Sequence, residues 1–192
     1  MIDLTELLLA SHSRGPREIG HYRASDLYAI THGYITPEKF LKPDPVDFLG
    51  AFRMWQGTWR HKQVQELLEK YGEEKYEIEP EATISLGEGL TLRGHADALS
   101  GSQEVIEIKT SDKVRGQATA GHLYQARVYC SLFDRRVGVV VQPVFVEKDG
   151  NPVKVYLKEI GRVEKNEVWF QQQLEKLRAF HTAVTKLASL KE

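Results

Sequence analysis

The 192-residue sequence has almost no cysteine and no long apolar run. Its single cysteine, Cys130, excludes an internal disulfide framework, a cysteine-based zinc site and a four-cysteine iron–sulfur cluster. No stretch approaches the roughly 18 consecutive apolar residues of a transmembrane helix. The first ten residues carry two acids and no base, unlike a secretory signal. We therefore expect an intracellular protein, and 28% charged residues are typical of a globular domain.

Charge of one sign is also lacking overall, since 26 Lys and Arg face 27 Asp and Glu. Locally the balance is uneven. Residues 50–62 contain bases and no acid, residues 66–81 contain seven acids, and residues 109–136 contain six bases against two acids. The two basic segments could converge on a polyanion. They could equally be solvated faces, so composition alone leaves both interpretations open.

Hydrophobic periodicity predicts alternating helices and strands. Helices are expected over residues 4–9, 25–30, 46–71, 117–133 and 164–187. Strands are expected over residues 76–86, with a break near Pro80, and over residues 90–99, 104–109, 137–146 and 153–157. Ser25 is the expected cap of the second helix, and the proline cluster of residues 37–45 is expected to be a loop. This order of elements predicts an α/β fold around a mixed sheet.

The most informative residues lie on two neighbouring strands. Glu107 and Lys109 are two apart and share a face, and a hairpin can bring Asp97 beside Glu107. Two close carboxylates repel unless a cation lies between them, and Mg²⁺ or Mn²⁺ prefers such oxygen ligands. The ion polarises a phosphoryl oxygen and lowers the pKa of bound water, while Lys109 stabilises the developing charge. The alternative is an exposed strand with an incidental Glu–Lys pair.

Two further pairs stand at helical spacing. Gly57 and His61 lie on the long helix, and Gln125 and Tyr129 lie on the helix that follows Lys109. Each pair is spaced i, i+4 and therefore shares one helical face. We expect that Gly57 allows a close approach to the sheet and that His61 reaches the metal as a neutral imidazole.

Taken together, four motifs follow one another: Gly-x-x-x-His, Gly-x-x-Asp, Glu-x-Lys and Gln-x-x-x-Tyr. In this order they resemble the RecB-type branch of the PD-(D/E)XK nuclease superfamily, which includes CRISPR-associated nucleases. The resemblance covers residues 25–129 and implies a restriction-endonuclease-like core with a mixed central sheet. The expected division is an N-terminal helical segment (1–44), a nuclease core (45–160) and a C-terminal packing helix (161–192).

The resemblance also implies roles for individual residues. The implied ligands of Mg²⁺ or Mn²⁺ are His61, Asp97, Glu107 and the carbonyl of Ile108. Lys109 would be the catalytic lysine, with Gln125 and Tyr129 supporting the site or positioning the DNA backbone. Many relatives also hold an iron–sulfur cluster. The cysteines are missing here, so we expect no cluster and a clamp made instead by the N-terminal helices and the final helix.

Contacts to DNA are expected from basic residues around this site. The loop after Lys109 supplies Lys113 and Arg115, and the long helix supplies Arg53 and Arg60. His95, which shares a face with Asp97, is a weaker candidate. On the long helix, Trp55 and Trp59 are expected in the core, with base stacking as the alternative.

The predicted function is a metal-dependent DNA nuclease, most simply an exonuclease acting on single-stranded or end-frayed DNA. Its expected partners are DNA and proteins of DNA processing, in repair, CRISPR adaptation or viral genome processing. A restriction enzyme is a rival, although 192 residues leave little room for base recognition. The other alternative is a nucleic-acid-binding subunit whose nuclease site is inactive.

Overall fold

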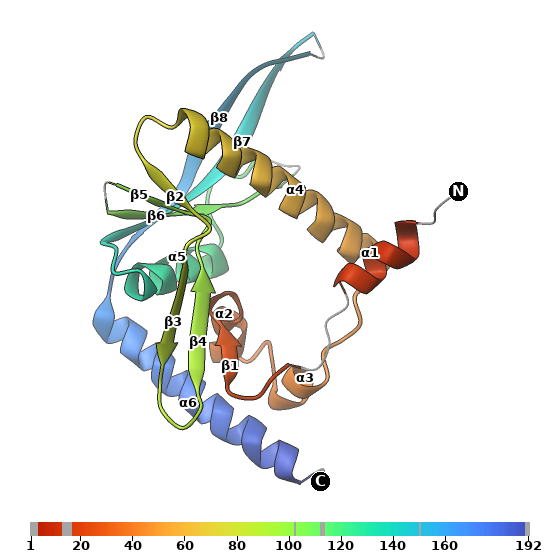
Figure 1. Cartoon of the computed structure of the whole chain (residues 1–192), viewed down its shortest axis with the longest axis vertical. Coiled ribbons are helices and arrows are strands. Elements are labelled where there is room, and N and C mark those ends of the chain that lie inside the picture. The colour runs from red at the N-terminus through yellow and green to blue at the C-terminus, as the bar shows by residue number, and fades with distance from the viewer. Residues whose placement is uncertain (1–3, 13–16, 102, 112–113, 150, 191–192) are drawn as a thin grey trace.

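The computed structural model describes residues 4–12, 17–101, 103–111, 114–149 and 151–190 (Figure 1). The helices are α1 (Leu4–His12), α2 (Ala24–Thr31), α3 (Pro37–Leu41), α4 (Phe48–Tyr71), α5 (Ala120–Leu132) and α6 (Glu167–Ser189). The strands are β1 (His21–Arg23), β2 (Tyr76–Ile78), β3 (Glu81–Ser85), β4 (Thr91–His95), β5 (Ala98–Ser100), β6 (Glu104–Ile108), β7 (Val137–Lys148) and β8 (Asn151–Glu164). None of the described helices has the length and apolarity needed to cross a membrane.

The strands form two mixed sheets with helices around them. A three-stranded sheet has the order β1-β4-β3, and a five-stranded sheet has the order β2-β5-β6-β7-β8. Each contains one parallel pair, β1 with β4 and β6 with β7, while the other pairs are antiparallel. The mixed α/β architecture expected from the sequence is therefore confirmed.

The division into two sheets comes from a break that two neighbouring strands share. The expected strand 76–86 is interrupted at Glu79-Pro80, which separates β2 from β3. The expected strand 90–99 is interrupted at residues 96–97, which separates β4 from β5. Pro80 has no N–H to give to a ladder, and Glu79 has a positive φ of 50°. Backbone bonds still join the two breaks, from Glu79 N–H to the Asp97 carbonyl (3.2 Å) and from Ala96 N–H to the Pro80 carbonyl (3.2 Å). Asp97 thus lies at the junction of the two sheets.

Three local predictions near the N-terminus are wrong. Helix α2 begins at Ala24, with Arg23 at its N-cap and no side-chain cap, so Ser25 lies inside the first turn. Strand β1 was not expected, because it is only three residues long and pairs with the distant β4. Within the proline cluster, Pro37 starts the short helix α3, and Thr36 caps it. Proline at the first helical position loses no helical hydrogen bond.

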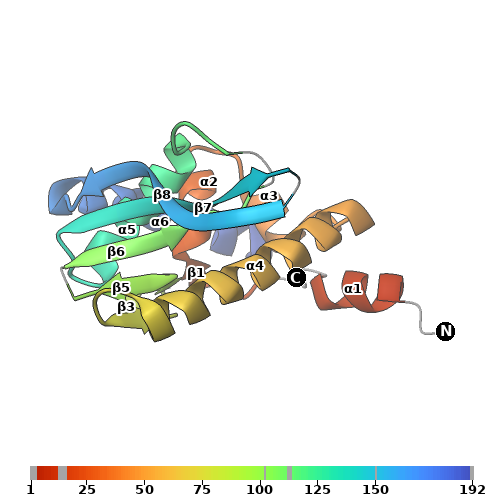
Figure 2. The ribbon, with the colours of Figure 1, turned by 90° about the horizontal axis from the view of Figure 1, so that it is seen from above.

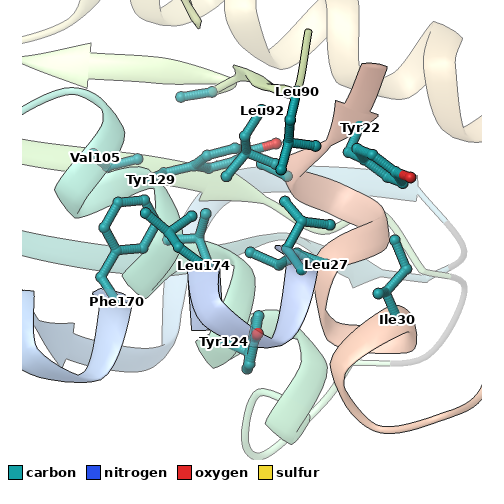
Figure 3. Close-up of a cluster of buried hydrophobic side chains, with 14 of the residues drawn as sticks. Tyr22, Leu27, Ile30, Leu90, Leu92, Val105, Tyr124, Tyr129, Phe170 and Leu174 are labelled. Carbon is teal, nitrogen blue, oxygen red and sulfur yellow. The ribbon is translucent and has the colours of Figure 1, made fainter. Parts of the chain in front are cut away.

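The N-terminal helices pack against the final helix, as expected. The ring of Tyr22 stacks on Phe40 with centroids 5.0 Å apart, and its edge meets Phe180 of α6 at 6.1 Å. The Tyr22 hydroxyl also bonds His181 Nδ1 (3.1 Å). Figure 3 shows Tyr22 and α2 residues in one apolar cluster with Phe170 and Leu174 of α6. Hydrophobic periodicity predicts an apolar stripe on this helix that includes Val168, but Val168 is exposed.

Helix α4 departs further from its predicted burial. Its C-terminal half packs Val64 and Leu68 against the apolar cluster under the five-stranded sheet. Its N-terminal half runs beyond the sheet toward α1 (Figures 1 and 2). Trp55 and Trp59 are therefore 50% and 60% exposed, and the prediction that they belong to the core is wrong. Helical spacing of aromatic residues identifies a face but not what covers it.

Helix α5 begins with a capping box that makes stability depend on pH. His122 N–H donates to Thr119 Oγ1 (3.3 Å), and Thr119 N–H donates to His122 Nδ1 (3.4 Å), which must therefore be deprotonated. Burial, followed by the charges of Lys109 and Arg115, lowers the pKa of His122 to about 4. The unfolded chain binds this proton at its ordinary pKa of about 6.5. The contribution to stability is thus complete above that pH and is lost as the pH falls toward about 4.

The variant His122→Gln tests this linkage, because glutamine completes a capping box without titrating. We expect the variant to match the wild type in urea unfolding near about pH 7.5 and to lose less stability than the wild type near about pH 5. Equal losses at the lower pH would contradict the assignment.

Candidate active site

Strand pairing brings the two predicted carboxylates together. The antiparallel register sets Ala98 opposite Ile106, which carries Asp97 to the level of Glu107. Asp97 Oδ2 accepts a hydrogen bond from the backbone N–H of Ile108 (2.5 Å). Glu107 is only 2% exposed, although it faces away from the apolar cluster that contains Ile106 and Ile108.

Helix α4 adds His61 to this pair. His61 Nε2 makes a short contact with the Ile108 carbonyl oxygen and lies 3.3 Å from Asp97 Oδ2. One turn later, Gln65 Nε2 donates to the Asp97 carbonyl (3.0 Å) and fixes the helix against the sheet junction. The space around Gly57 is less restricted than predicted. A Cβ there would meet only Thr110 Oγ1 at 3.5 Å, an ordinary contact, so the approach of α4 does not require glycine.

Helix α5 holds the predicted catalytic lysine from the other side. Lys109 Nζ pairs with Glu107 Oε1 and donates to Gln125 Oε1 (3.1 Å). Gln125 Nε2 in turn donates to the Tyr129 hydroxyl (3.0 Å). The four side chains form one hydrogen-bonded row, in which Tyr129 orients Gln125 and Gln125 orients Lys109.

Gly94 explains how Tyr129 comes so close to the sheet. A Cβ at Gly94 would lie 2.9 Å from Tyr129 Cε1 and 2.7 Å from Leu132 Cδ1, which is closer than van der Waals contact permits. The glycine of the Gly-x-x-Asp motif therefore makes room on β4 for the helix that carries Tyr129 and Gln125.

The electrostatics of the site favour a positive charge between the carboxylates. Burial, followed by the charge of Asp97, raises the pKa of Glu107, and Lys109 offsets only part of the rise. Burial alone would lower the pKa of His61, but the hydrogen bond and charge of Asp97 outweigh it, and the pKa of His61 is raised. Both shifts reflect negative charge gathered in a small, partly dry volume.

The predicted metal ligands are chemically suited to a hard divalent cation. His61 Nε2 contacts both the Ile108 carbonyl oxygen and Asp97 Oδ2. Glu107 Oε2 is buried and has no hydrogen-bond partner among the described residues. Across the described part of the chain, no three His, Cys, Asp or Glu side chains form a ready metal cluster. His61 and Lys109 compensate the two carboxylates instead, so metal ligation stays a prediction.

Two hollows flank this centre, and they contain most of the basic residues expected to contact DNA. The first, which we call the α4 hollow, has a volume of about 630 Å³. It is lined by Arg53, Gln56, Gly57, Arg60, Thr110, Ser111 and Arg115. The α2 hollow, of about 420 Å³, is lined by Arg23, Ala24, Ser25, Arg93, His95 and Tyr129. The two basic segments of the sequence thus meet in the α4 hollow.

The remaining candidates are placed less favourably. His95 Nε2 accepts a hydrogen bond from Arg93 Nε (3.0 Å) and lies 3.6 Å from Glu81 Oε2. This ring nitrogen therefore already interacts with neighbouring side chains. Lys113 lies outside the described residues. Two buried glutamines near the site, Gln65 and Gln142, were not predicted from the sequence. The sequence feature that could have identified them is a polar residue within an apolar helix face or an apolar strand.

We found no protein-family model that matches the chain and no curated protein that matches it. Solved structures do match. The protein SSO0001 is 21% identical with a TM-score of 0.62, over 92% of this chain and 84% of that one. An alkaline exonuclease from Laribacter hongkongensis is 15% identical with a TM-score of 0.59, over 97% and 96%. A phage-related exonuclease from Haemophilus somnus 129PT is 12% identical with a TM-score of 0.65, over 90% and 96%.

The chain has a restriction-endonuclease-like fold. The predicted architecture is thereby confirmed over nearly the whole length of the chain. The restriction-endonuclease-like core places Asp97 directly before β5 and Glu107 on the neighbouring β6, with His61 and Gln125 reaching them from two helices.

Proposed function

We propose that the protein is a metal-dependent DNA nuclease that hydrolyses phosphodiester bonds, most simply as an exonuclease on single-stranded or end-frayed DNA. One observation carries the proposal. Asp97, Glu107, His61 and Lys109 converge at the junction of the two sheets, and Gln125 supports Lys109. The shared fold with two exonucleases agrees with this assignment.

The proposed cofactor is Mg²⁺ or Mn²⁺, held by His61, Asp97, Glu107 and the Ile108 carbonyl. When bound, such an ion polarises a phosphoryl oxygen and lowers the pKa of a water molecule. Lys109 has a separate role. Its ammonium group, oriented by Glu107 and Gln125, can donate to the attacking water or to a phosphate oxygen that gains charge. The low exposure of Glu107 strengthens these interactions by excluding solvent.

The proposed substrate follows from the charges around the site. One hollow next to Lys109 is lined by Arg53, Arg60 and Arg115. The positive charges of these arginines can neutralise the phosphates of a sugar–phosphate backbone. The alkaline exonuclease of similar fold has also been determined in complex with dAMP. Trp55 and Trp59 are exposed on the same helix as two of these arginines, so base stacking stays a prediction for them.

Assignment to the RecB-type branch, and to partners in DNA processing, rests on the order of the four motifs. The competing function is a nucleic-acid-binding subunit with an inactive site. Glu107 Oε2 is buried and has no hydrogen-bond partner in the part of the chain that the structure describes. It argues against this alternative, because such a group costs stability and gives nothing to phosphate binding.

The decisive experiment incubates end-labelled single- and double-stranded DNA with the protein and Mg²⁺, Mn²⁺ or a chelator. We expect metal-dependent degradation that is lost in Glu107→Gln and kept in Glu77→Ala, an exposed acid on β2. A folded wild type that binds DNA equally with and without metal, and never cleaves it, would favour the binding subunit.

Phosphate contact by the α4 hollow has its own signature. Replacing Arg53 by alanine should make the negative slope of log K against log salt shallower by roughly 0.7 to 0.9, because the protein neutralises one phosphate fewer. The loss of affinity should be the same for different DNA sequences. Arg178→Ala, on the exposed side of α6, is the matched control and should leave the slope unchanged. An unchanged slope for Arg53→Ala would remove this residue from the interface.

A further inference from the structure

The backbone of Arg115 is held on both sides by one cross-strand pair. Gln142 on β7 and Lys158 on β8 are register partners near the base of the long hairpin. Arg115 N–H donates to Gln142 Oε1 (2.8 Å), and Lys158 Nζ donates to the Arg115 carbonyl (3.3 Å). The backbone N–H and the backbone carbonyl of Arg115 are therefore both hydrogen-bonded to side chains of the five-stranded sheet.

Gln142 is an unusual residue for its place in the strand. It is 1% exposed and interrupts an otherwise apolar stretch of β7. A buried amide costs free energy unless both of its ends are hydrogen-bonded. Here the second end, Nε2, donates to the carbonyl of Ser111 (3.5 Å). Gln142 thus bonds two residues of the segment that follows Lys109.

Those two residues, Ser111 and Arg115, both line the α4 hollow, with Arg53 and Arg60 on the helix side. The charge of Arg115 also reaches His122, where it adds to the charge of Lys109 in lowering the pKa of that ring. Arg115 therefore borders the hollow and is also close enough to the start of α5 for its charge to act on His122.

We propose that Gln142, assisted by Lys158, is a positioning residue for a phosphate subsite in the α4 hollow. By fixing the backbone of Arg115, it presents the guanidinium to a phosphate of the bound strand without a further loss of backbone entropy on binding. The inference rests on the proposed function, since it assumes that a nucleic-acid strand enters the hollow.

The main test is Gln142→Met, which keeps the length of the side chain and removes the hydrogen bonds to Arg115 and Ser111. DNA affinity is measured with chelator so that nothing is cleaved. It should fall by about 3- to 10-fold, the usual range for one hydrogen bond, because the contact between Arg115 and phosphate is weakened. In cleavage assays KM should rise while kcat stays unchanged. Gln173→Met is the matched control, because Gln173 is a buried glutamine of α6 bonded by the Tyr124 hydroxyl.

Two readouts separate positioning from general stability. The amide proton of Arg115 should exchange faster in Gln142→Met than in the wild type or in Gln173→Met. In an Arg115→Ala background, Gln142→Met should weaken DNA binding no further. The surface variant Lys158→Met, which removes only the bond to the carbonyl, should act in the same direction if Gln142→Met fails to fold.

Unchanged exchange at Arg115, or an equal loss of affinity with and without the Arg115 side chain, would overturn the proposal. Its failure is distinguishable from failure of the proposed function. A wild type that binds DNA but does not cleave it would refute the nuclease, while the affinity and exchange measurements would still decide the role of Gln142.

Discussion

Replacing Lys109 by methionine is expected to lower the rate of DNA cleavage by roughly 10²- to 10³-fold. Methionine fills the space of the lysine stem but cannot donate to water or phosphate. The loss should lie in the chemical step, because Lys109 is held by Glu107 and Gln125 rather than by residues that line the α4 hollow. Single-turnover cleavage of end-labelled DNA with saturating protein measures that step directly.

Two controls accompany this variant. Lys75→Met removes an exposed lysine before β2 and should leave cleavage unchanged, which excludes a general effect of charge. Far-ultraviolet circular dichroism and urea unfolding should show that Lys109→Met remains folded. A decrease of less than about tenfold in a folded variant would deny Lys109 a role in stabilising the transition state.

The largest effect on stability is expected for Gly94→Ala. The added methyl group would press against the buried ring of Tyr129 and the end of Leu132, and overpacking of this kind typically costs about 1–3 kcal/mol. Displacement of Tyr129 also removes the hydrogen bond that orients Gln125 (3.0 Å), so cleavage should fall together with stability. Urea unfolding and the cleavage assay measure the two effects.

Gly57→Ala is the natural comparison, because it changes the other motif glycine in the same way. Its new methyl group would meet only Thr110 Oγ1 at 3.5 Å, and alanine favours a helix interior over glycine by about 0.5–1 kcal/mol. We therefore expect Gly57→Ala to be as stable as the wild type or slightly more stable. If the two variants lost the same stability, the distinction between the two glycines would be wrong.

Much of the candidate site could be predicted from the sequence because its parts are local. Asp97 and Glu107 lie ten residues apart on strands with a short connection, so antiparallel pairing has few ways to separate them. Gln125 and Tyr129 follow the 3.6-residue period of one helix. His61 is the exception, because only the resemblance of its Gly-x-x-x-His motif to a known family predicted that it lies beside these strands.

Other features depended on partners far away in the chain. Strand β1 exists because it pairs with β4, about 70 residues later, and three residues alone have no periodicity to detect. Trp55 and Trp59 have core-like spacing but lie on exposed sides of α4. Gln142 and Lys158 are ordinary residues in the sequence and become a pair only through the register of β7 and β8.

The sequence by itself determined the period of each main element and the residue types that could carry phosphodiester chemistry. The sequence also predicted the strand break near Pro80. The tertiary structure decided which faces are covered and that the neighbouring strand breaks at residues 96–97, and so how closely Asp97, Glu107 and Lys109 are surrounded. The physical reason is that periodicity is a property of neighbouring residues, whereas burial, pKa shifts and the shape of a hollow depend on the elements packed against them.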